Sequence, residues 1–248
     1  MTDKIILTTL GDYPEVPVSE GTMLANETWT WRFAAPAFSP RPSPCGRACP
    51  LGNDIPTTMR QVTEGDIEGA ADTLLWEDPF PALLGRVCPG FCMADCNRGL
   101  FDERVSIRDI ERFVGDRSTR QGPPAEAART GKSVAIVGSG PAGLSAAYFL
   151  TMLGHAVTVF EKERFAGGVP QLGIPHYRLS RKVMAGVVRT MRAMGVAIRT
   201  SHPIERNDLS DLASSHDALF IAPGAHAAAA MGIGGEGLPG VRQGLAFL

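Results

Sequence analysis

The sequence lacks a large excess of either charge, an export leader and a long unbroken apolar run. Its 24 Lys and Arg and 26 Asp and Glu give a formal charge of -2, which argues against the strongly basic class of nucleic-acid-binding proteins. The first ten residues mix Asp3 and Lys4 with threonines, so no secretory leader is recognised and a cytoplasmic protein is expected. Residues 134–160 are mostly apolar, but glycines and a proline interrupt them, so no membrane span is predicted.

Cysteine is scarce and unevenly distributed. The five cysteines form two runs, Cys45-Gly-Arg-Ala-Cys49-Pro and Cys88-Pro-Gly-Phe-Cys92-Met-Ala-Asp-Cys96. An odd number without a leader argues against a disulfide framework. Four-residue spacing would place the thiols of each run on one face of a helix, which suggests a shared metal. Prolines after Cys49 and Cys88 favour an iron–sulfur site over zinc, and thiols packed without any metal are the alternative.

The composition divides the chain into four segments. Residues 1–44 have few periodic apolar positions and a proline-rich end, which predicts an extended segment. Residues 45–117 have helical spacing and predict a small all-α domain, in which Ser106 begins a capped helix. Residues 118–132 are polar and rich in Pro, Gly and Ala, so they form the predicted linker. Residues 133–248 form a predicted α/β domain.

The α/β domain opens on a dinucleotide-binding βαβ unit. A β-branched strand at 134–137 leads into the run Gly138-Ser139-Gly140-Pro141-Ala142-Gly143 and then into a helix, which is the context that this fingerprint requires. Gly138 allows the tight turn, Gly140 lets backbone N–H groups approach a pyrophosphate, and Gly143 lets the helix pack on the strand. The N-terminus of that helix adds partial positive charge toward phosphates.

An acidic residue follows at the spacing that this fingerprint predicts. Glu161 ends the second strand about 20 residues beyond the glycines, where its carboxylate can accept hydrogen bonds from an adenosine ribose and repel a 2′-phosphate. NAD and FAD therefore both fit, whereas NADP does not. A helix at 179–194 and strands at 196–200 and 218–222 are also predicted. Residues 232–237 repeat the glycine pattern without a strand before or a helix after, so they are predicted to be a loop.

Several runs of sequence resemble one family of oxidoreductases. Residues 45–56 (Cys-Gly-Arg-Ala-Cys-Pro-Leu-Gly-Asn-Asp-Ile-Pro), 85–92 and 105–113 resemble the N-terminal domain of the glutamate synthase small subunit, which also opens dihydropyrimidine dehydrogenase; residues 173–179 and 222–225 match the flavin half. Residues 26–32 resemble electron-transfer subunits of anaerobic oxidoreductases. The resemblance implies a multi-domain protein, with a small all-α iron–sulfur domain followed by an α/β Rossmann-like FAD-binding domain.

The resemblance also implies cofactor ligands. Family members carry two more cysteines before the position of Cys45 and bind two [4Fe-4S] clusters, but residues 39–44 contain no cysteine. One cluster would then use Cys49, Cys88, Cys92 and Glu111. A four-thiolate set with Cys45 or Cys96 in place of the carboxylate remains open, because thiolate is the usual cluster ligand. For the flavin nucleotide, the resemblance adds Lys162, Gly168, Arg178, Ile204 and Gly224.

The sequence thus predicts an electron-transfer module that passes electrons between NAD(P)H, FAD and a [4Fe-4S] cluster. Its expected partner is a larger oxidoreductase subunit, such as that of a glutamate synthase or 2-oxoacid oxidoreductase, or a ferredoxin-like carrier, in a hetero-oligomer. Family members continue into an NAD(P)H domain and a final flavin segment, which this sequence is expected to lack. The five histidines have no ligand-like spacing, so no catalytic residue is predicted. A noncatalytic zinc-stabilised nucleotide-binding scaffold and an NAD-dependent dehydrogenase are the alternatives.

Overall fold

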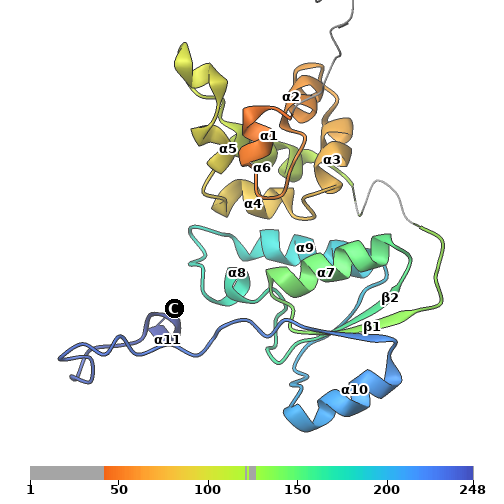
Figure 1. Ribbon diagram of the computed structural model, residues 1–248, viewed down its shortest axis with the longest axis vertical. Helices are drawn as coiled ribbons and strands as arrows, with labels where there is room; N and C mark the ends of the chain where they lie inside the picture. The colour runs from red at the N-terminus through yellow and green to blue at the C-terminus, as the bar shows by residue number, and fades with distance from the viewer. Residues whose placement is uncertain (1–41, 121, 123–126, 248) are drawn as a thin grey trace, which may run out of the picture. The chain divides into compact units, whose positions relative to one another are not determined.

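The structure is a computed structural model that describes residues 42–120, 122 and 127–247 (Figure 1). The predicted extended segment, residues 1–44, lies outside this range except for its last three residues. The described chain begins with helices and continues into a parallel sheet with its own helices, in the order that the sequence predicts. Among the helices described, none has the length and apolarity needed to cross a membrane.

The helical part is built from short helices. In chain order they are α1 (Pro44–Ala48), α2 (Ile55–Thr63), α3 (Ile67–Leu75), α4 (Pro81–Val87), α5 (Phe91–Ala94), the 3-10 turn η4 (Asn97–Leu100) and α6 (Ile107–Arg117). Asp54 and Asp66 cap α2 and α3, because their side chains accept hydrogen bonds from the N–H groups of Thr57 and Gly69.

Helices α4 and α6 pack with their backbones in close approach. A Cβ added at Gly85 would overlap the backbone of Arg112, and one added at Gly115 would overlap the backbone of Ala82. The α6 helix follows Ser106, as predicted, but the Ser106 side chain makes no capping hydrogen bond. The predicted cap is therefore wrong although the predicted start of the helix is right. Packing against α4 accounts for α6 without the cap.

The α/β part contains a four-stranded parallel sheet in the order β3-β2-β1-β4. Its elements are β1 (Ser133–Val137), α7 (Pro141–Met152), β2 (Ala156–Phe160), α8 (Val169–Leu172), α9 (Arg181–Ala193), β3 (Ala197–Arg199), η5 (Arg206–Asp208), α10 (Leu209–Ser215), β4 (Ala218–Ile221) and α11 (Gly244–Phe247). Figure 1 shows α7 and α9 on one face of the sheet and α10 on the other side. The predicted strands and the predicted α9 helix are confirmed to within two residues, and residues 232–237 form a loop, also as predicted.

One hydrophobic core joins the helical part to the α/β part. Leu75 and Phe80 are buried in the same cluster as Ile136 of β1 and Met191 of α9. Tyr148 of α7 is fully buried there, and its hydroxyl donates a 2.8 Å hydrogen bond to the carbonyl oxygen of Leu75. A buried carbonyl group without a partner costs about 1–3 kcal/mol, so this bond stabilises the contact between the end of α3 and α7.

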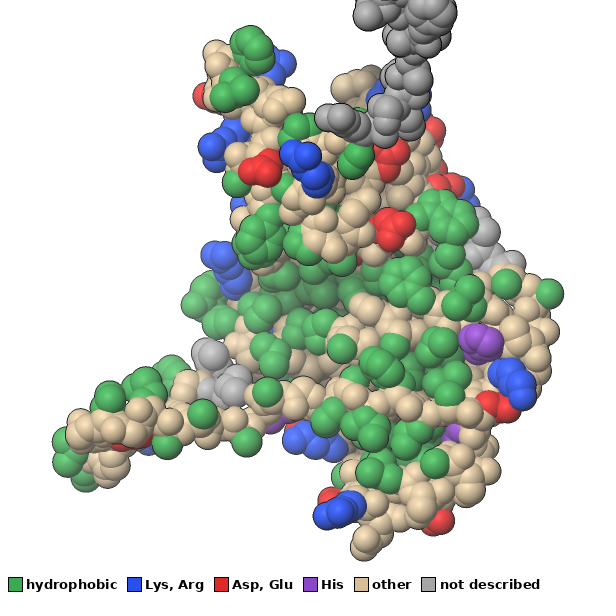
Figure 2. Space-filling model, viewed as in Figure 1, with side chains coloured by type: hydrophobic (Ala, Val, Ile, Leu, Met, Phe, Trp, Pro, Cys, Tyr) green, Lys and Arg blue, Asp and Glu red, His purple; other side chains and the backbone are tan. Residues whose placement is uncertain are grey.

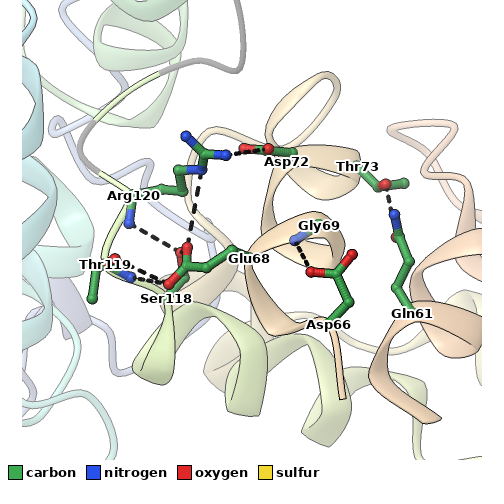
Figure 3. A network of polar contacts seen from close by, with 9 residues as sticks. All are labelled: Gln61, Asp66, Glu68, Gly69, Asp72, Thr73, Ser118, Thr119 and Arg120. Carbon is green, nitrogen blue, oxygen red and sulfur yellow. Dashed lines mark hydrogen bonds and ion pairs between the residues drawn. The ribbon is translucent and has the colours of Figure 1, made fainter. Parts of the chain in front are cut away.

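The predicted linker is anchored where it leaves α6. The Glu68 carboxylate of α3 accepts hydrogen bonds from the Ser118 hydroxyl at 2.8 Å and from the Thr119 N–H at 2.9 Å, as Figure 3 shows. Arg120 then pairs with Asp72 of α3 at 2.5 Å. The hydrogen bonds from Thr119 and Ser118 lower the pKa of Glu68, which stays ionised to hold the start of the linker.

Asp217 fixes the beginning of β4 beside the beginning of β1. Its carboxylate accepts hydrogen bonds from the Lys132 ammonium and from the Ser133 N–H, both at 2.8 Å, and its own N–H donates to the Ser133 carbonyl at 2.9 Å. The Lys132 hydrogen bond, followed by that of the Ser133 N–H, lowers the pKa of Asp217 to about 2.

We expect Asp217→Asn to lower the urea midpoint at pH 7 but not at pH 2. The pKa of Asp217 in the folded protein lies below the unfolded value of about 3.9, so its stabilisation is complete above that value and is lost as the pH falls through about 2. Urea unfolding followed by circular dichroism at both pH values measures the difference. Glu77→Gln is the control, because the exposed Glu77 side chain makes no hydrogen bond within the described chain. An equal deficit at both pH values would contradict the prediction.

Candidate functional site

A cavity of about 220 Å³ lies beyond the carboxyl ends of the parallel strands. Its walls come from the glycine loop after β1, residues 160–163 at the end of β2, residues 202–205 after β3, residues 222–224 after β4, and the α8 helix. Ligands of open parallel sheets bind at this edge, because the loops and helix N-termini converge there. The cavity is therefore the candidate nucleotide site.

Each glycine of the loop after β1 is required, or allowed, for a different structural reason. Gly138 has a φ of 103°, and a Cβ there would overlap the Ala222 carbonyl oxygen. A Cβ on Gly143 would overlap the Gly138 carbonyl oxygen, so α7 begins in close contact with the loop. Gly140 instead has open space at the Cβ position and lines the cavity. Since a side chain at Gly140 would fill the place of a pyrophosphate, the loop fits a dinucleotide.

The Glu161 carboxylate at the end of β2 is buried and held by three donors. Its Oε2 accepts hydrogen bonds from the Ser139 N–H at 2.9 Å and from the Ser139 hydroxyl at 2.5 Å, and its Oε1 accepts one from the Glu163 N–H at 2.9 Å. The Ser139 hydroxyl also accepts a bond from the Gly167 N–H at 3.1 Å. Each carboxylate oxygen can accept about two hydrogen bonds, so Oε1 keeps an acceptor site for a ribose hydroxyl.

Most of the predicted nucleotide-binding residues line this cavity. They are Gly138, Gly140, Pro141, Glu161, Lys162, Gly168, Ile204 and Gly224. Ser139, Ala142 and Gly143 belong to the loop and the first turn of α7 but do not line the cavity. Arg178 lies elsewhere, in a surface groove with Arg86 and Arg108.

The sequence analysis missed the residues that follow β3. His202, Pro203 and Glu205 line the cavity beside the predicted Ile204, and the His202 ring lies 5.3 Å from the ring of Phe160 between centroids. The strand before them was predicted, and residues after the carboxyl end of a parallel strand belong to the binding edge. That rule would have identified them.

Cys92 lies at the centre of a second candidate site. It is buried in the helical part and packs in one cluster with Cys45 and Cys49. Burial raises the pKa of the Cys92 thiol to about 11, and the neighbouring Cys49, Cys88 and Glu111 contribute in the same direction. These neighbours are the three ligands that the resemblance places with Cys92. Deprotonation of these groups beside one another is unfavourable, and a cation bound among them would offset that repulsion.

The second run of cysteines does not share a helical face. Cys88 ends α4, Cys92 lies in α5, and Cys96 follows α5, so the prediction of one common helix is wrong for this run. Pro89 and Gly90, the latter with a φ of 78°, break the helix between Cys88 and Cys92. This break separates α4 from α5, so Cys88 at the C-terminal end of α4 and Cys92 in α5 belong to two different short helices.

The thiols and carboxylates stand apart from one another. Within residues 42–120, 122 and 127–247, no three His, Cys, Asp or Glu side chains come close enough to hold a single metal ion. The ligands of a [4Fe-4S] cluster each bind a different iron atom, so they are spaced more widely than those of a single ion. Cys96 differs from Cys92 in its environment, because a hydrogen bond from the Val105 N–H lowers its pKa.

Glu111 has a buried carboxyl partner that the sequence analysis did not identify. Asp78 is fully buried; its Oδ1 accepts a 2.7 Å hydrogen bond from the Phe80 N–H, and its Oδ2 has no partner in the part of the chain described. Burial raises the pKa of Asp78 and Glu111, and for Glu111 the neighbouring Asp78 adds to the rise. Three thiols beside such a carboxyl form a donor set suited to an iron–sulfur cluster.

Two protein families match separate parts of the chain. Residues 38–123 match the family described as dihydropyrimidine dehydrogenase domain II, 4Fe-4S cluster. Residues 136–170 match the NAD(P)-binding Rossmann-like domain. The first match contains all five cysteines and Glu111, and the second contains the glycine loop and Glu161.

Curated relatives match across both parts. The beta subunit of the NADP(+)-dependent formate dehydrogenase of Moorella thermoacetica is 36% identical over 83% of this chain and 33% of its own length. The glutamate synthase [NADPH] small chain of Mycobacterium tuberculosis is 37% identical over 82% of this chain and 43% of its own length. The NADPH-Fe(3+) oxidoreductase subunit beta of Geobacter sulfurreducens is 36% identical over 78% and 30%.

The chain spans less than half the length of each of these relatives. All three are subunits of oxidoreductases, and the matches extend through the cysteine-rich helical part into the α/β part. The chain is thus a relative of the glutamate synthase small chain, with an iron–sulfur domain of the dihydropyrimidine dehydrogenase domain II type followed by a Rossmann-like nucleotide-binding domain.

Proposed function

We propose that this chain is an electron-transfer module of an oxidoreductase, with FAD in the cavity beside Glu161 and one [4Fe-4S] cluster at Cys49, Cys88, Cys92 and Glu111. The observation that carries the proposal is that one hydrophobic core joins the part with the thiols to the part with the nucleotide cavity. A nucleotide cavity alone would suit many enzymes, and thiols alone would suit a zinc scaffold. Together they suit electron transfer between two redox groups.

When bound, FAD accepts two electrons and releases them singly, which suits a neighbouring one-electron cluster. The residues of this chain bind and orient the cofactor. The open Gly140 backbone and the N-terminus of α7 would hold the pyrophosphate, and the free acceptor site of Glu161 Oε1 would bind the adenosine ribose. A carboxylate at this position would repel a 2′-phosphate, so FAD and not NADPH is the proposed ligand of this cavity.

The environment of Cys92 supports the ligand set with Glu111 over the four-thiolate alternative with Cys96. Cys49, Cys88 and Glu111 are the charged groups that raise the pKa of Cys92, whereas Cys96 is not among them. The Cys96 thiol instead accepts a hydrogen bond from the N–H of Val105, a residue that follows η4 in the sequence. The Glu111 carboxylate would be the fourth ligand of the cluster, with the buried Asp78 beside it.

The proposed module works with other polypeptide segments. Relatives that it matches are named as NADPH-linked or NADP(+)-linked subunits, and this chain spans less than half of each. We therefore infer that NAD(P)H delivers or receives electrons at a domain outside these residues. The final acceptor is a larger oxidoreductase subunit or a small electron carrier, in a hetero-oligomer.

Anaerobic purification tests the proposed function directly. We expect a yellow-brown protein that contains FAD and about four iron atoms and four sulfides per chain. Absorption spectra before and after dithionite, iron and sulfide assays, and chromatography of the released nucleotide measure these quantities. A colourless protein with one zinc ion would overturn the proposal in favour of the scaffold alternative, and bound NAD without flavin would favour a dehydrogenase.

Cys92→Ser is expected to remove most of the iron. Serine is a poor cluster ligand, and position 92 lies among the other proposed ligands. Cys96→Ser is the matched control and should keep its iron, because Cys96 lies outside the proposed set. Iron assays and electron paramagnetic resonance of the reduced proteins measure the effect. Loss of iron in the Cys96 variant with retention in the Cys92 variant would contradict the assignment.

Ser139→Ala is expected to destabilise the protein and weaken FAD binding. The change removes a hydrogen bond to the buried Glu161 carboxylate and one from the Gly167 N–H, and a bond to a charged group contributes about 1.5–3 kcal/mol. Urea unfolding and titration of flavin fluorescence measure the two effects. Ser145→Ala is the control. Ser145 lies in α7, the helix that follows the glycine loop, and its side chain makes no hydrogen bond within the described residues. Equal behaviour of the two variants would refute the role of Ser139.

A further inference from the structure

The basic residues of the chain are concentrated in one stretch. Residues 164–204 contain no Asp or Glu, although the chain has 26 of them. The same stretch contains seven basic residues: Arg164, Arg178, Arg181, Lys182, Arg189, Arg192 and Arg199. A chain with a net charge of -2 therefore carries a strongly positive region, and such a region attracts anions from solution.

Part of this region forms a hollow that is separate from the nucleotide cavity. Arg164, Arg181, Arg189 and Arg192 line a surface hollow of about 450 Å³, together with Phe165, and we call these five residues the arginine hollow. No carboxylate lines it within the described part of the chain. The nucleotide cavity uses residues 161–163 and 168 of the turn after β2, whereas the arginine hollow uses residues 164–166.

The guanidinium groups of the arginine hollow have no acidic partners in the described chain. Arg164, Arg189 and Arg192 are exposed, and only Arg181 is engaged, by donating to the carbonyl oxygens of Pro170 and Ile174 at 3.1 Å. Four neighbouring cations without carboxylates repel one another, so the proximity of their charges does not stabilise the fold. An anion from outside the described residues would relieve that repulsion.

A second arginine-rich groove shows the contrasting case. Arg86 and Arg112 line that groove; the Asp116 carboxylate accepts two hydrogen bonds of 2.8 Å from Arg86 and also lies 3.7 Å from Arg112. The ion pair between Arg86 of α4 and Asp116 of α6 connects these two helices. The arginine hollow has no equivalent of Asp116, which separates it from arginines that serve the fold.

The length of the arginine hollow indicates the size of its ligand. Arg181 and Arg192 are eleven positions apart on α9, which corresponds to about 16 Å along a helix. A single phosphate can contact only one or two of these groups, whereas a row of carboxylates on a protein surface can contact all of them. Phe165 is 54% exposed, with the Arg164 guanidinium 5.3 Å from its ring centroid. Exposed aromatic and arginine side chains together are typical of protein interfaces.

We propose that the arginine hollow binds the acidic face of a partner protein. The inference rests on the proposed function, since it gives the chemistry of the partner that exchanges electrons with this module. Arg164, Arg189 and Arg192 steer that partner through long-range attraction, and Phe165 adds apolar contact once the two surfaces meet. Opposite charge at this surface also fixes the orientation of the partner.

The test uses the anaerobically purified full chain and poly-L-glutamate as the acidic probe. Binding is measured by thermophoresis at low and high salt, with inorganic tripolyphosphate as a second probe. Arg189→Glu with Arg192→Glu reverses two charges of the hollow. Arg206→Glu with Arg242→Glu makes the same net change at exposed positions outside it and is the control. A second variant, Arg189→Gln with Arg192→Gln, removes the two charges without reversing them. Circular dichroism of both variants shows whether weaker binding comes from a folding defect.

We expect poly-L-glutamate to bind the unmodified chain and to dissociate at high salt. The charge reversal in the hollow should weaken binding at least about tenfold, the glutamine pair less, and the control pair by no more than about twofold. Equal loss in the hollow and control variants would overturn the proposal, because net charge alone would explain it. Tighter binding of tripolyphosphate than of poly-L-glutamate at the hollow would also overturn it, since a phosphate ligand would then be indicated.

The same samples separate this proposal from the proposed function. Flavin and iron are assayed in each variant, and both should be unchanged by substitutions in the hollow, which lies outside the cavity and the thiol site. Missing flavin or iron in the unmodified chain would defeat the proposed function but leave the probe result intact. Unaltered cofactors with no effect of the hollow variants would defeat only the docking proposal.

Discussion

The packing of the segment between α3 and α4 against α7 and α9 is the contact on which the rest of the structure depends. Leu75, Phe80 and Leu83 enter the core of the α/β part, and the Tyr148 hydroxyl satisfies a carbonyl group at the end of α3. The helical part has no large core of its own, because its remaining buried clusters are small. The stability of the thiol site is therefore coupled to that of the nucleotide-binding part.

The two candidate sites use buried carboxylates in opposite ways. Glu161 is buried, and its carboxylate accepts hydrogen bonds from three donors within the chain. Glu111 lies against another buried carboxyl group, Asp78, and the pair has fewer donors than acceptors. The first arrangement suits a ligand with hydroxyl groups, and the second suits a cation. This difference in donor supply supports the proposal that the nucleotide and the metal bind in different parts of the chain.

Features with local causes were predictable from the sequence, and features with distant causes were not. The strands, α7, α9 and the roles of Gly138 and Gly143 follow from short-range patterns of apolar residues and glycines. Periodicity misplaced the second cysteine run, because Pro89 and Gly90 interrupt a helix that the spacing alone implied. Asp78 escaped detection because its buried neighbour Glu111 is far away in the sequence, whereas His202 could have been identified from its place after a parallel strand. The glycine fingerprint leaves the residue at position 139 unspecified, so the contact of Ser139 with Glu161 depends on where the second strand ends.

The donors around Glu161 have a consequence for how tightly a nucleotide would bind. Ser139 and Glu163 hold the carboxylate in one orientation through hydrogen bonds within the chain, and the Gly167 N–H links the Ser139 hydroxyl to the next turn. Ordering a free glutamate side chain costs up to about 2 kcal/mol of entropy, which is already spent here when the protein folds. An adenosine ribose bound at this carboxylate would not have to offset that entropy again, so the ordered side chain would raise its affinity.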